Sequence, residues 1–120
     1  MKLYIGGREN GQRERAARDC GAVPMPCTPE EAFSVLCIDA FHMTIRNLLE
    51  NGGDAREFAR KLLEKNPDAV IVCDEIGLGI VPLDGFERRW REETGRALCI
   101  LAEGAERVIR VYCGIPQVIK

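Results

Sequence analysis

The residues best suited to chemistry lie in a glycine-rich octet near the start of the chain. Residues 6–13 read Gly-Gly-Arg-Glu-Asn-Gly-Gln-Arg and follow a short β-prone run. The spacing of Gly6 and Gly11, between a strand and a helix, is that of a phosphate-binding loop, in which backbone N–H groups hold an anion. Gln12 and Arg13 stand where that motif has Lys and Ser or Thr. The octet is therefore a degenerate Walker A motif, with a plain glycine turn as the alternative.

The two replacements change the chemistry expected of this loop. Gln12 has no charge to offset a β- or γ-phosphate, and Arg13 cannot ligate a cation. Glu9 adds a negative charge that opposes phosphate. We therefore expect that the loop holds no Mg²⁺ for any GTP or ATP bound there, and that phosphoryl transfer is slow. The residues predicted to contact a nucleotide or its phosphates are Gly6, Gly7, Arg8, Asn10, Gly11, Gln12 and Arg13.

Two carboxylates stand where buried strands are expected to end. Asp39 closes the apolar segment 33–39, and Glu75 follows the apolar segment 69–73. Ligands of parallel sheets bind beyond the carboxyl ends of the strands. Asp39 and Glu75 are therefore the candidate catalytic residues, as a base or as the holder of a magnesium-bound water. The alternative for each is a helix cap or a surface charge.

His42 is the only histidine of the chain. Its ordinary pKa of about 6.5 suits a general base near neutral pH. A lone histidine one turn into a helix is also a common capping or packing residue, and that alternative stays open. A single imidazole and the absence of C-x-x-C spacings lead us to predict no metal centre. Cys37, Cys73 and Cys113 are expected to be buried strand residues.

The elements that must position these residues follow from hydrophobic periodicity. The predicted strands are Lys2–Ile5, Phe33–Asp39, Ala69–Cys73, Arg107–Tyr112 and Gln117–Lys120. The predicted helices are Gln12–Cys20, Phe41–Asn51, Ala55–Lys65 (with Asp54 as its cap) and Asp84–Gly104. The proline-rich Cys20–Pro29 is expected to be irregular, ending in a capping sequence at Thr28–Glu31. This alternation predicts an α/β fold with a mostly parallel sheet, helices on both faces and an antiparallel edge strand at the end of the chain.

Composition and charge narrow the classes of function. The chain has 120 residues, 46% of them hydrophobic, which predicts one domain over residues 1–120. The 17 Lys and Arg against 19 Asp and Glu give no electrostatic reason to expect a nucleic acid or a membrane as partner. No apolar run is long enough for a secretory signal or a membrane span, so we expect a cytoplasmic protein.

A longer segment resembles a known family. Residues 70–82 read Val-Ile-Val-Cys-Asp-Glu-Ile-Gly-Leu-Gly-Ile-Val-Pro. This stretch resembles the segment V-x-N-E-V-G-x-G-I-V-P of the adenosylcobinamide kinase/adenosylcobinamide-phosphate guanylyltransferase family (CobU type). Further segments similar to that family are Val35–Asp39, Asn47–Leu49, Arg91–Arg96, Ala102–Val108 and Gly114–Lys120.

The resemblance implies a three-layer, RecA-like P-loop fold and a role late in cobalamin biosynthesis. Members of the family phosphorylate adenosylcobinamide, transfer GMP to it through a guanylylated His, and form trimers. By resemblance, Gly6–Arg13 is the phosphate loop, Asp39 the acidic residue after a core strand, and Glu75 the acidic residue of a switch-like loop. The expected small-molecule partner is then a nucleotide or a corrinoid, and the expected assembly is a homo-oligomer, a trimer.

The departures from the family concern nucleotide chemistry. The family has a strand, a His-containing helix and a further strand-loop where this chain has only Cys20–Pro29, so the guanylyl-accepting His has no counterpart. The Asn of N-E-V-G is Asp74 here, and a later N-Q pair is Leu98-Cys99. We expect a minimised, truncated member that is impaired as a kinase and as a guanylyltransferase. The alternatives are an active transferase whose rearranged site uses Arg13 and Glu75, and a non-catalytic interaction module.

Overall fold

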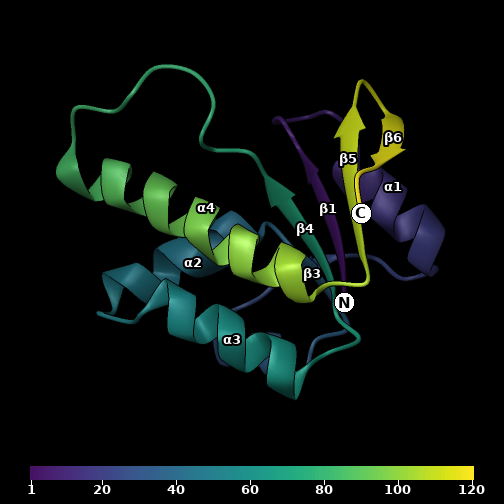
Figure 1. The fold of residues 1–120 in the computed structure, drawn as a ribbon, viewed down its shortest axis with the longest axis horizontal. Helices are drawn as coiled ribbons and strands as arrows, with labels where there is room; N and C mark the ends of the chain where they lie inside the picture. The colour runs from purple at the N-terminus through teal and green to yellow at the C-terminus, as the bar shows by residue number, and fades with distance from the viewer.

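Six strands form one sheet in the computed structural model, which describes residues 1–120 (Figure 1). The strands are β1 (Lys2–Gly6), β2 (Met25–Pro26), β3 (Cys37–Asp39), β4 (Val70–Asp74), β5 (Arg107–Tyr112) and β6 (Ile115–Val118). Their order across the sheet is β2-β3-β4-β1-β5-β6, and every neighbouring pair is parallel except β5–β6. The predicted α/β class is confirmed, including the antiparallel pair at the carboxyl-terminal edge.

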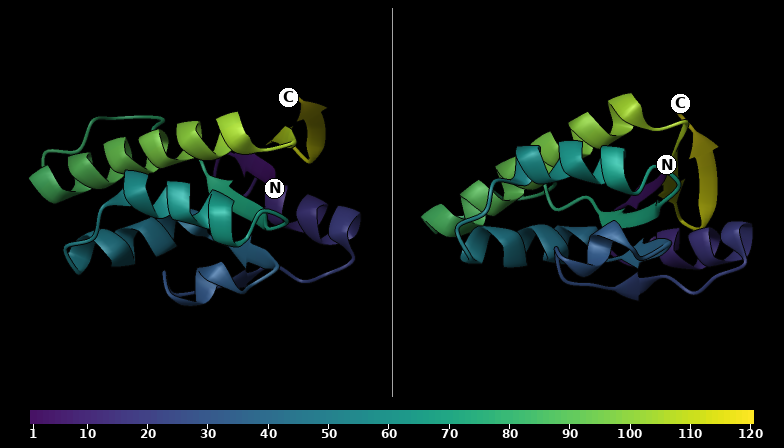
Figure 2. Two further views of the ribbon diagram at one scale, coloured as in Figure 1. Left: turned by 60° about the horizontal axis from the view of Figure 1, so that its bottom comes forward. Right: turned by 90° about the horizontal axis from the view of Figure 1, so that it is seen from below.

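Helices cover both faces of the sheet, as predicted. They are α1 (Gln12–Cys20), α2 (Phe41–Glu50), α3 (Ala55–Lys65) and α4 (Gly85–Gly104), with a 3₁₀ turn η1 (Glu31–Phe33). α3 and α4 lie side by side over one face, and α1 lies over the other (Figure 2). α2 packs against β4 and α4 and joins the core on the α3–α4 side. The cap at Asp54 is confirmed, since its carboxylate accepts from the N–H groups of Arg56 and Glu57.

The alternation of the central strands divides the core in two. Leu3 and Ile71 point to the α2–α4 side, and their neighbours Tyr4 and Val72 point to α1. Apolar residues on both sides are what a parallel strand covered by helices requires. The buried Tyr4 keeps its hydroxyl satisfied by donating to Asp19 Oδ2 at 2.9 Å. Both faces of β1 and β4 are therefore fixed by packing, which holds the loops at their ends.

The segment between α1 and β3 differs from its prediction. Irregular backbone is expected for Cys20–Pro29, but β2 pairs in parallel with β3 through Met25↔Ile38 and Pro26↔Asp39. β2 is the edge strand, and a proline is tolerated there because its nitrogen need not join the ladder. The capping sequence is confirmed, since Thr28 Oγ1 accepts from the N–H of Glu31 at 3.2 Å. The element that it begins is only the short η1 turn.

Two predicted strands are misplaced. Segment 33–39 is a strand only over Cys37–Asp39, because the preceding carbonyls are bound elsewhere: Asn66 Nδ2 donates to Ala32 O at 2.9 Å and to Val35 O at 2.8 Å. The last strand begins at Ile115 and not at Gln117, because Cys113 and Gly114, with φ of 52° and 76°, form a two-residue turn. Cys113 is consequently exposed in this turn rather than buried in a strand.

The parallel pairing brings the carboxyl ends of β1, β3 and β4 to one edge of the sheet. Residues 7–11 follow β1, Ala40 follows β3, and residues 75–84 follow β4. The last of these loops arches away from the sheet before it returns to α4 (Figure 1). This edge therefore gathers the glycine-rich loop, Asp39 and the Asp74–Pro82 segment in one place.

Candidate functional site

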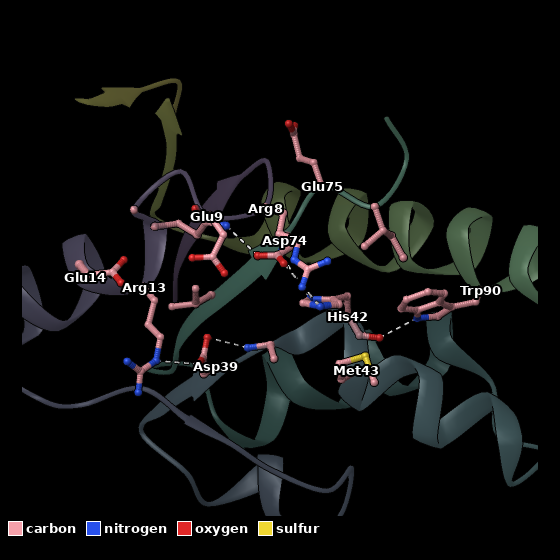
Figure 3. Close-up of a pocket in the computed structure, with 15 residues that line it drawn as sticks. Arg8, Glu9, Arg13, Glu14, Asp39, His42, Met43, Asp74, Glu75 and Trp90 are labelled. Atoms are coloured by element: carbon pink, nitrogen blue, oxygen red, sulfur yellow. Dashed lines mark hydrogen bonds and ion pairs between the residues drawn. The ribbon is translucent and has the colours of Figure 1, made fainter. Parts of the chain in front are cut away.

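A cavity of about 630 Å³ opens at this edge of the sheet. Its walls come from the glycine-rich loop and the start of α1, the β3–α2 junction, the end of β4, and Trp90 of α4 (Figure 3). The predicted site residues that line it are Arg8, Gly11, Gln12, Arg13, Asp39 and Glu75. The volume lies within the range of small-molecule binding sites.

The glycine-rich loop is shaped by close backbone contacts. A Cβ on Gly6 would lie 2.5 Å from Val111 O, and Gly11 has a φ of +94° with Gly114 Cα 3.2 Å from the position of its missing Cβ. Asn10 ties the loop to the β5–β6 turn, because Asn10 Oδ1 accepts from the Cys113 N–H at 2.9 Å and Asn10 O accepts from the Gly114 N–H at 2.8 Å. Glycine is therefore required at both ends of the loop, and the carboxyl-terminal hairpin supports it.

Gln12 points into the protein, not into solvent. The residue is 3% exposed, and its Nε2 donates to Gly6 O at 3.2 Å, Gly7 O at 3.1 Å and Asp74 Oδ1 at 2.7 Å. Its Oε1 is buried without a hydrogen-bond partner. The amide thus joins the glycine-rich loop to the end of β4, and it brings no charge to the place where a Walker A lysine would stand.

Arg13 and Asp39 form an ion pair across the opening between α1 and β3. Arg13 Nε donates to Asp39 Oδ2 at 2.8 Å, and Arg13 Nη2 donates to Pro24 O at 3.2 Å. The other oxygen, Asp39 Oδ1, accepts from the Ala40 N–H at 2.8 Å. Both oxygens of the candidate carboxylate Asp39 therefore already have protein donors.

His42 lies beside Asp74 inside the cavity (Figure 3). His42 Nδ1 accepts from the Asp74 N–H at 3.3 Å, and His42 Nε2 lies 3.7 Å from Asp74 Oδ2. Trp90 Nε1 donates to His42 O at 2.7 Å and so fixes the first turn of α2. Burial lowers the pKa of His42, and this effect outweighs the opposing influence of the Asp74 and Asp39 carboxylates. His42 is therefore neutral at pH 7, and its contact with Asp74 is not an ion pair.

Glu75 begins the loop that leads to α4. Its backbone N–H donates to Gly6 O at 2.8 Å, whereas its side chain points away from His42 and Asp74 (Figure 3). Further along, Arg91 donates to the carbonyls of Gly77, Gly79 and Ile80. Arg88 likewise donates to Pro82 O and Leu83 O. The loop is therefore held against α4 by its backbone.

The side chains of this loop face the solvent. Ile80 and Leu83 are each 95% exposed, and Leu78 and Val81 are also exposed. We refer to Leu78, Ile80, Val81 and Leu83 as the apolar loop patch.

The structure shows no metal site among its acidic, cysteine and histidine residues. No group of three or more His, Cys, Asp or Glu side chains is arranged to hold a metal ion. Burial raises the pKa of Cys37 to about 11 and raises that of Cys73 as well, which suits the packing role expected for both.

The structure brings together residues that belong to separate segments of the sequence. Gln12, Arg13 and Asp39 lie around one cavity, as expected from the topology. Asp74 was noted only as a departure from a family motif, yet it contacts both Gln12 and His42. Its place at the end of an apolar strand is the signal that could have found it. Trp90 carries no such signal, because its helical spacing is that of an ordinary core residue.

Comparison with known proteins identifies the family to which the chain belongs. The model of the family described as CobU, cobinamide kinase / cobinamide phosphate guanyltransferase, matches residues 24–119. The chain belongs to the CobU family. A relative named bifunctional adenosylcobalamin biosynthesis protein CobP, from Pseudomonas aeruginosa, is 33% identical over 96 residues, which cover 75% of this chain and 56% of that protein. The chain thus spans little more than half the length of this relative.

The match to the CobU family includes one wall of the cavity and leaves out another. Asp39, His42 and Asp74 lie within the matched residues 24–119, whereas the loop Gly6–Arg13 precedes them. The comparison of that loop with a phosphate loop therefore depends on its own residues and geometry. None of the helices combines the length and the apolar character that crossing a bilayer requires.

Proposed function

We propose that this CobU-family chain binds a corrinoid of the cobinamide type or a purine nucleotide at the carboxyl edge of its sheet, and that it is impaired as a kinase and as a guanylyltransferase. The position of Gln12 carries the proposal. An uncharged amide, held by Gly6 O, Gly7 O and Asp74 Oδ1, takes the place of a Walker A lysine. This arrangement favours binding over phosphoryl transfer, because the lysine and a metal ion supply most of the charge stabilisation in that reaction.

The charges around the cavity support a binding role. Its acidic lining residues are Glu9, Glu14, Asp39, Asp74 and Glu75, against Arg8 and Arg13 as the basic ones. Arg13 is paired with Asp39, which leaves Arg8 as the unpaired cation. A phosphate group would be held by Arg8 and by the first N–H groups of α1, which have no partner within the helix. We therefore infer weak binding of a nucleotide, with neither the lysine nor the metal-binding hydroxyl of a Walker A loop to stabilise transfer of its phosphoryl group.

Guanylyl transfer needs a nucleophilic histidine, and the surroundings of His42 do not suit that role. His42 Nδ1 accepts from the Asp74 N–H, so its lone pair is engaged. The proton of the neutral ring is then on Nε2, which is a donor and not a nucleophile. Because His42 is the only histidine of the chain, no other imidazole could take its place.

The proposal is tested by isothermal titration of the whole chain with GTP, ATP and adenosylcobinamide, together with a kinase assay on the same ligands. We expect measurable binding of at least one ligand and turnover far below the 1–10³ s⁻¹ range, roughly, of ordinary enzymes. The variant Gln12→Lys should bind GTP about tenfold more tightly than the wild type, because an ammonium offers donors to the same acceptors and adds a charge. Gln12→Met, of similar length without charge or donors, is the matched control.

Two results would contradict the proposal. Turnover by the wild type at about 1 s⁻¹ or faster would show that the chain is a working transferase. Absence of binding for all the ligands, with a normal melting transition, would leave only an interaction module. Equal GTP affinity of Gln12→Lys and Gln12→Met would remove Gln12 as the reason for weak nucleotide binding.

We also infer that the chain forms a homo-oligomer, with the trimer of the family as the expected size. The apolar loop patch supports this, because its backbone is fixed by Arg88 and Arg91 while its side chains are exposed. Exposed apolar residues that adjoin one another mark interaction sites in soluble proteins. Light scattering on the wild type and on Ile80→Ser with Leu83→Ser tests the inference. A monomeric wild type would contradict it.

A further inference from the structure

His42 and Asp74 each leave one polar atom without a protein partner inside the cavity. His42 Nε2 and Asp74 Oδ2 lie 3.7 Å apart, beyond hydrogen-bond distance. The remaining polar atoms of both side chains are engaged: Nδ1 with the Asp74 N–H at 3.3 Å, and Oδ1 with Gln12 Nε2 at 2.7 Å. Met43 and Trp90 stand on the α2–α4 side of the pair and give it apolar surroundings (Figure 3).

The surroundings fix which atom donates and which accepts. Because His42 Nδ1 accepts an N–H, the neutral ring carries its proton on Nε2 and presents a donor. Asp74 Oδ2 is a carboxylate oxygen and presents an acceptor. Neither side chain can turn without losing a hydrogen bond, since Gln12 Nε2 donates to Asp74 Oδ1 and the Asp74 N–H donates to His42 Nδ1. His42 and Asp74 therefore present one donor and one acceptor to the cavity at a separation of 3.7 Å.

We propose that His42 Nε2–H and Asp74 Oδ2 together bind an uncharged hydroxyl group of the ligand, so that the site selects an alcohol over its phosphate ester. A hydroxyl oxygen accepts from Nε2–H while its own proton is donated to Oδ2, and both atoms are satisfied by one group. A phosphate accepts from Nε2–H, but it offers no proton and places negative charge beside Asp74. An ammonium donates to Oδ2, but it has no lone pair for Nε2–H. Of these three groups, only the hydroxyl satisfies both atoms.

The hydroxyl can come from either ligand of the proposed function, on which this inference rests. Cobinamide, as the substrate of a kinase, carries a hydroxyl that cobinamide phosphate has lost. A purine nucleoside carries ribose hydroxyls, which its 2′,3′-dideoxy form lacks. Each ligand therefore has a partner that differs at the group in question, and the two pairs identify the source of the hydroxyl.

The experiment is isothermal titration of the whole chain with cobinamide, cobinamide phosphate, guanosine and 2′,3′-dideoxyguanosine. We expect the wild type to prefer the hydroxyl-bearing member of one pair by about tenfold or more, since hydrogen bonds to charged groups are strong. Asp74→Asn keeps an acceptor for Gln12 but replaces the second oxygen with NH₂. His42→Phe keeps a ring beside Trp90 but has no donor. Both variants should reduce the preference to about onefold.

Asp68→Asn is the matched control for Asp74→Asn. It removes an exposed carboxylate at the opposite end of β4, and it should keep the preference of the wild type. Equal binding of both members in each pair, or an unchanged preference in properly folded Asp74→Asn and His42→Phe, would overturn the inference and leave the proposed function in place. Absence of binding by all four ligands would overturn the inference, and the proposed function as well if GTP, ATP and adenosylcobinamide also failed to bind.

A second readout needs no variant. The chain has a single histidine, so the imidazole ¹⁵N signals belong to His42 without assignment. We expect the Nε2–H tautomer at neutral pH, with a change of the Nε2 signal on addition of the ligand that binds. A ring protonated on Nδ1 would overturn the inference, because Nε2 would then present a lone pair to the cavity.

Discussion

The two sides of the cavity use their polar groups differently. On the α1 side, Gln12 Nε2, the Arg13 guanidinium and Asn10 Oδ1 all donate to or accept from other parts of the chain. On the opposite side, His42 Nε2 and Asp74 Oδ2 face each other at 3.7 Å with no closer partner. The first side thus holds the fold together, and the second is left with hydrogen-bonding capacity for a ligand.

The glycine-rich loop resembles a phosphate loop in its position between strand and helix, but not in the chemistry of its side chains. The loop follows β1 and opens α1 as a phosphate loop does, but Gln12 is directed into the protein and Arg13 is paired with Asp39. The residues with unused polar atoms, His42 and Asp74, lie outside that motif. If the proposals above hold, the loop keeps the backbone shape of a phosphate loop, whereas the selective contacts come from His42 and the end of β4.

On the α1 side of the cavity, we expect the largest effect on stability from a change of charge at position 12. Gln12→Glu places a carboxylate among Gly6 O, Gly7 O and Asp74 Oδ1, all of which are acceptors. We expect the free energy of unfolding in urea to fall by about 3 kcal/mol at neutral pH, because a buried charge is left unpaired beside another. Gln12→Lys offers donors to the same acceptors and should lose less than about 1 kcal/mol. Equal losses in the two variants would contradict this account of Gln12.

We expect a smaller loss of stability from a substitution where the glycine-rich loop passes the β5–β6 turn. Gly11→Ala combines a φ of +94° with a Cβ 3.2 Å from Gly114 Cα, so we expect a loss of about 2 kcal/mol in urea unfolding. Gly21→Ala is the matched control. Gly21 has a φ of +65° and open space around the missing Cβ, so only the backbone cost of about 1 kcal/mol remains. A loss for Gly11→Ala no greater than that for Gly21→Ala would mean that the turn does not restrict the loop.

The ion pair between Arg13 and Asp39 contributes still less to the free energy of unfolding. Asp39→Asn removes the charge that faces Arg13, whose side chain is 49% exposed, so we expect a loss of about 0.5–1 kcal/mol. Binding of the hydroxyl-bearing ligand should stay within about twofold of the wild type, because both oxygens of Asp39 already have protein donors. A large loss of binding with little change in stability would move Asp39 to the ligand-binding side.

The smallest expected effect is the pH dependence due to His42. Burial lowers the pKa of His42 in the folded state, whereas the unfolded chain binds this proton at a pKa of about 6.5. Above that pH neither state carries the proton. Below it the unfolded state binds the proton first, so the free energy of unfolding decreases as the pH falls. Urea unfolding at about pH 7 and about pH 5.5 should show this decrease in the wild type and less of it in His42→Phe. Identical slopes in the two proteins would show that His42 is not destabilised by protonation.

Much of the fold could be predicted from local pattern, and the exceptions have identifiable causes. α1, α3 and β5 have the predicted bounds, since periodicity and capping act within each segment. β2 could not be predicted, because Pro26 is acceptable only at the edge position that the topology assigns to it. β3 is short because Asn66, on a later element, takes the carbonyls of Ala32 and Val35.

The candidate site was predictable in place but not in detail. The rule that ligands lie beyond parallel strand ends points to the edge of the sheet where the cavity lies. The inward turn of Gln12 depends on Asp74, which is 62 positions away in the sequence. The state of His42 depends on a backbone N–H 32 positions away. Residue types and spacing do not predict such distant contacts. The donor on His42 Nε2 and the acceptor Asp74 Oδ2 can therefore be identified only from the three-dimensional structure.

The tie between Asn10 and the β5–β6 turn has a consequence for the order of assembly. Asn10 is bound by Cys113, 103 positions later, and β1 lies between β4 and β5. During synthesis β1 emerges well before β4 and β5, its partners in the sheet, and before the turn that shapes its loop. Such sequence-distant pairing makes folding slow and leaves early segments exposed. The glycine-rich wall of the cavity therefore takes its final shape only after Cys113 has left the ribosome.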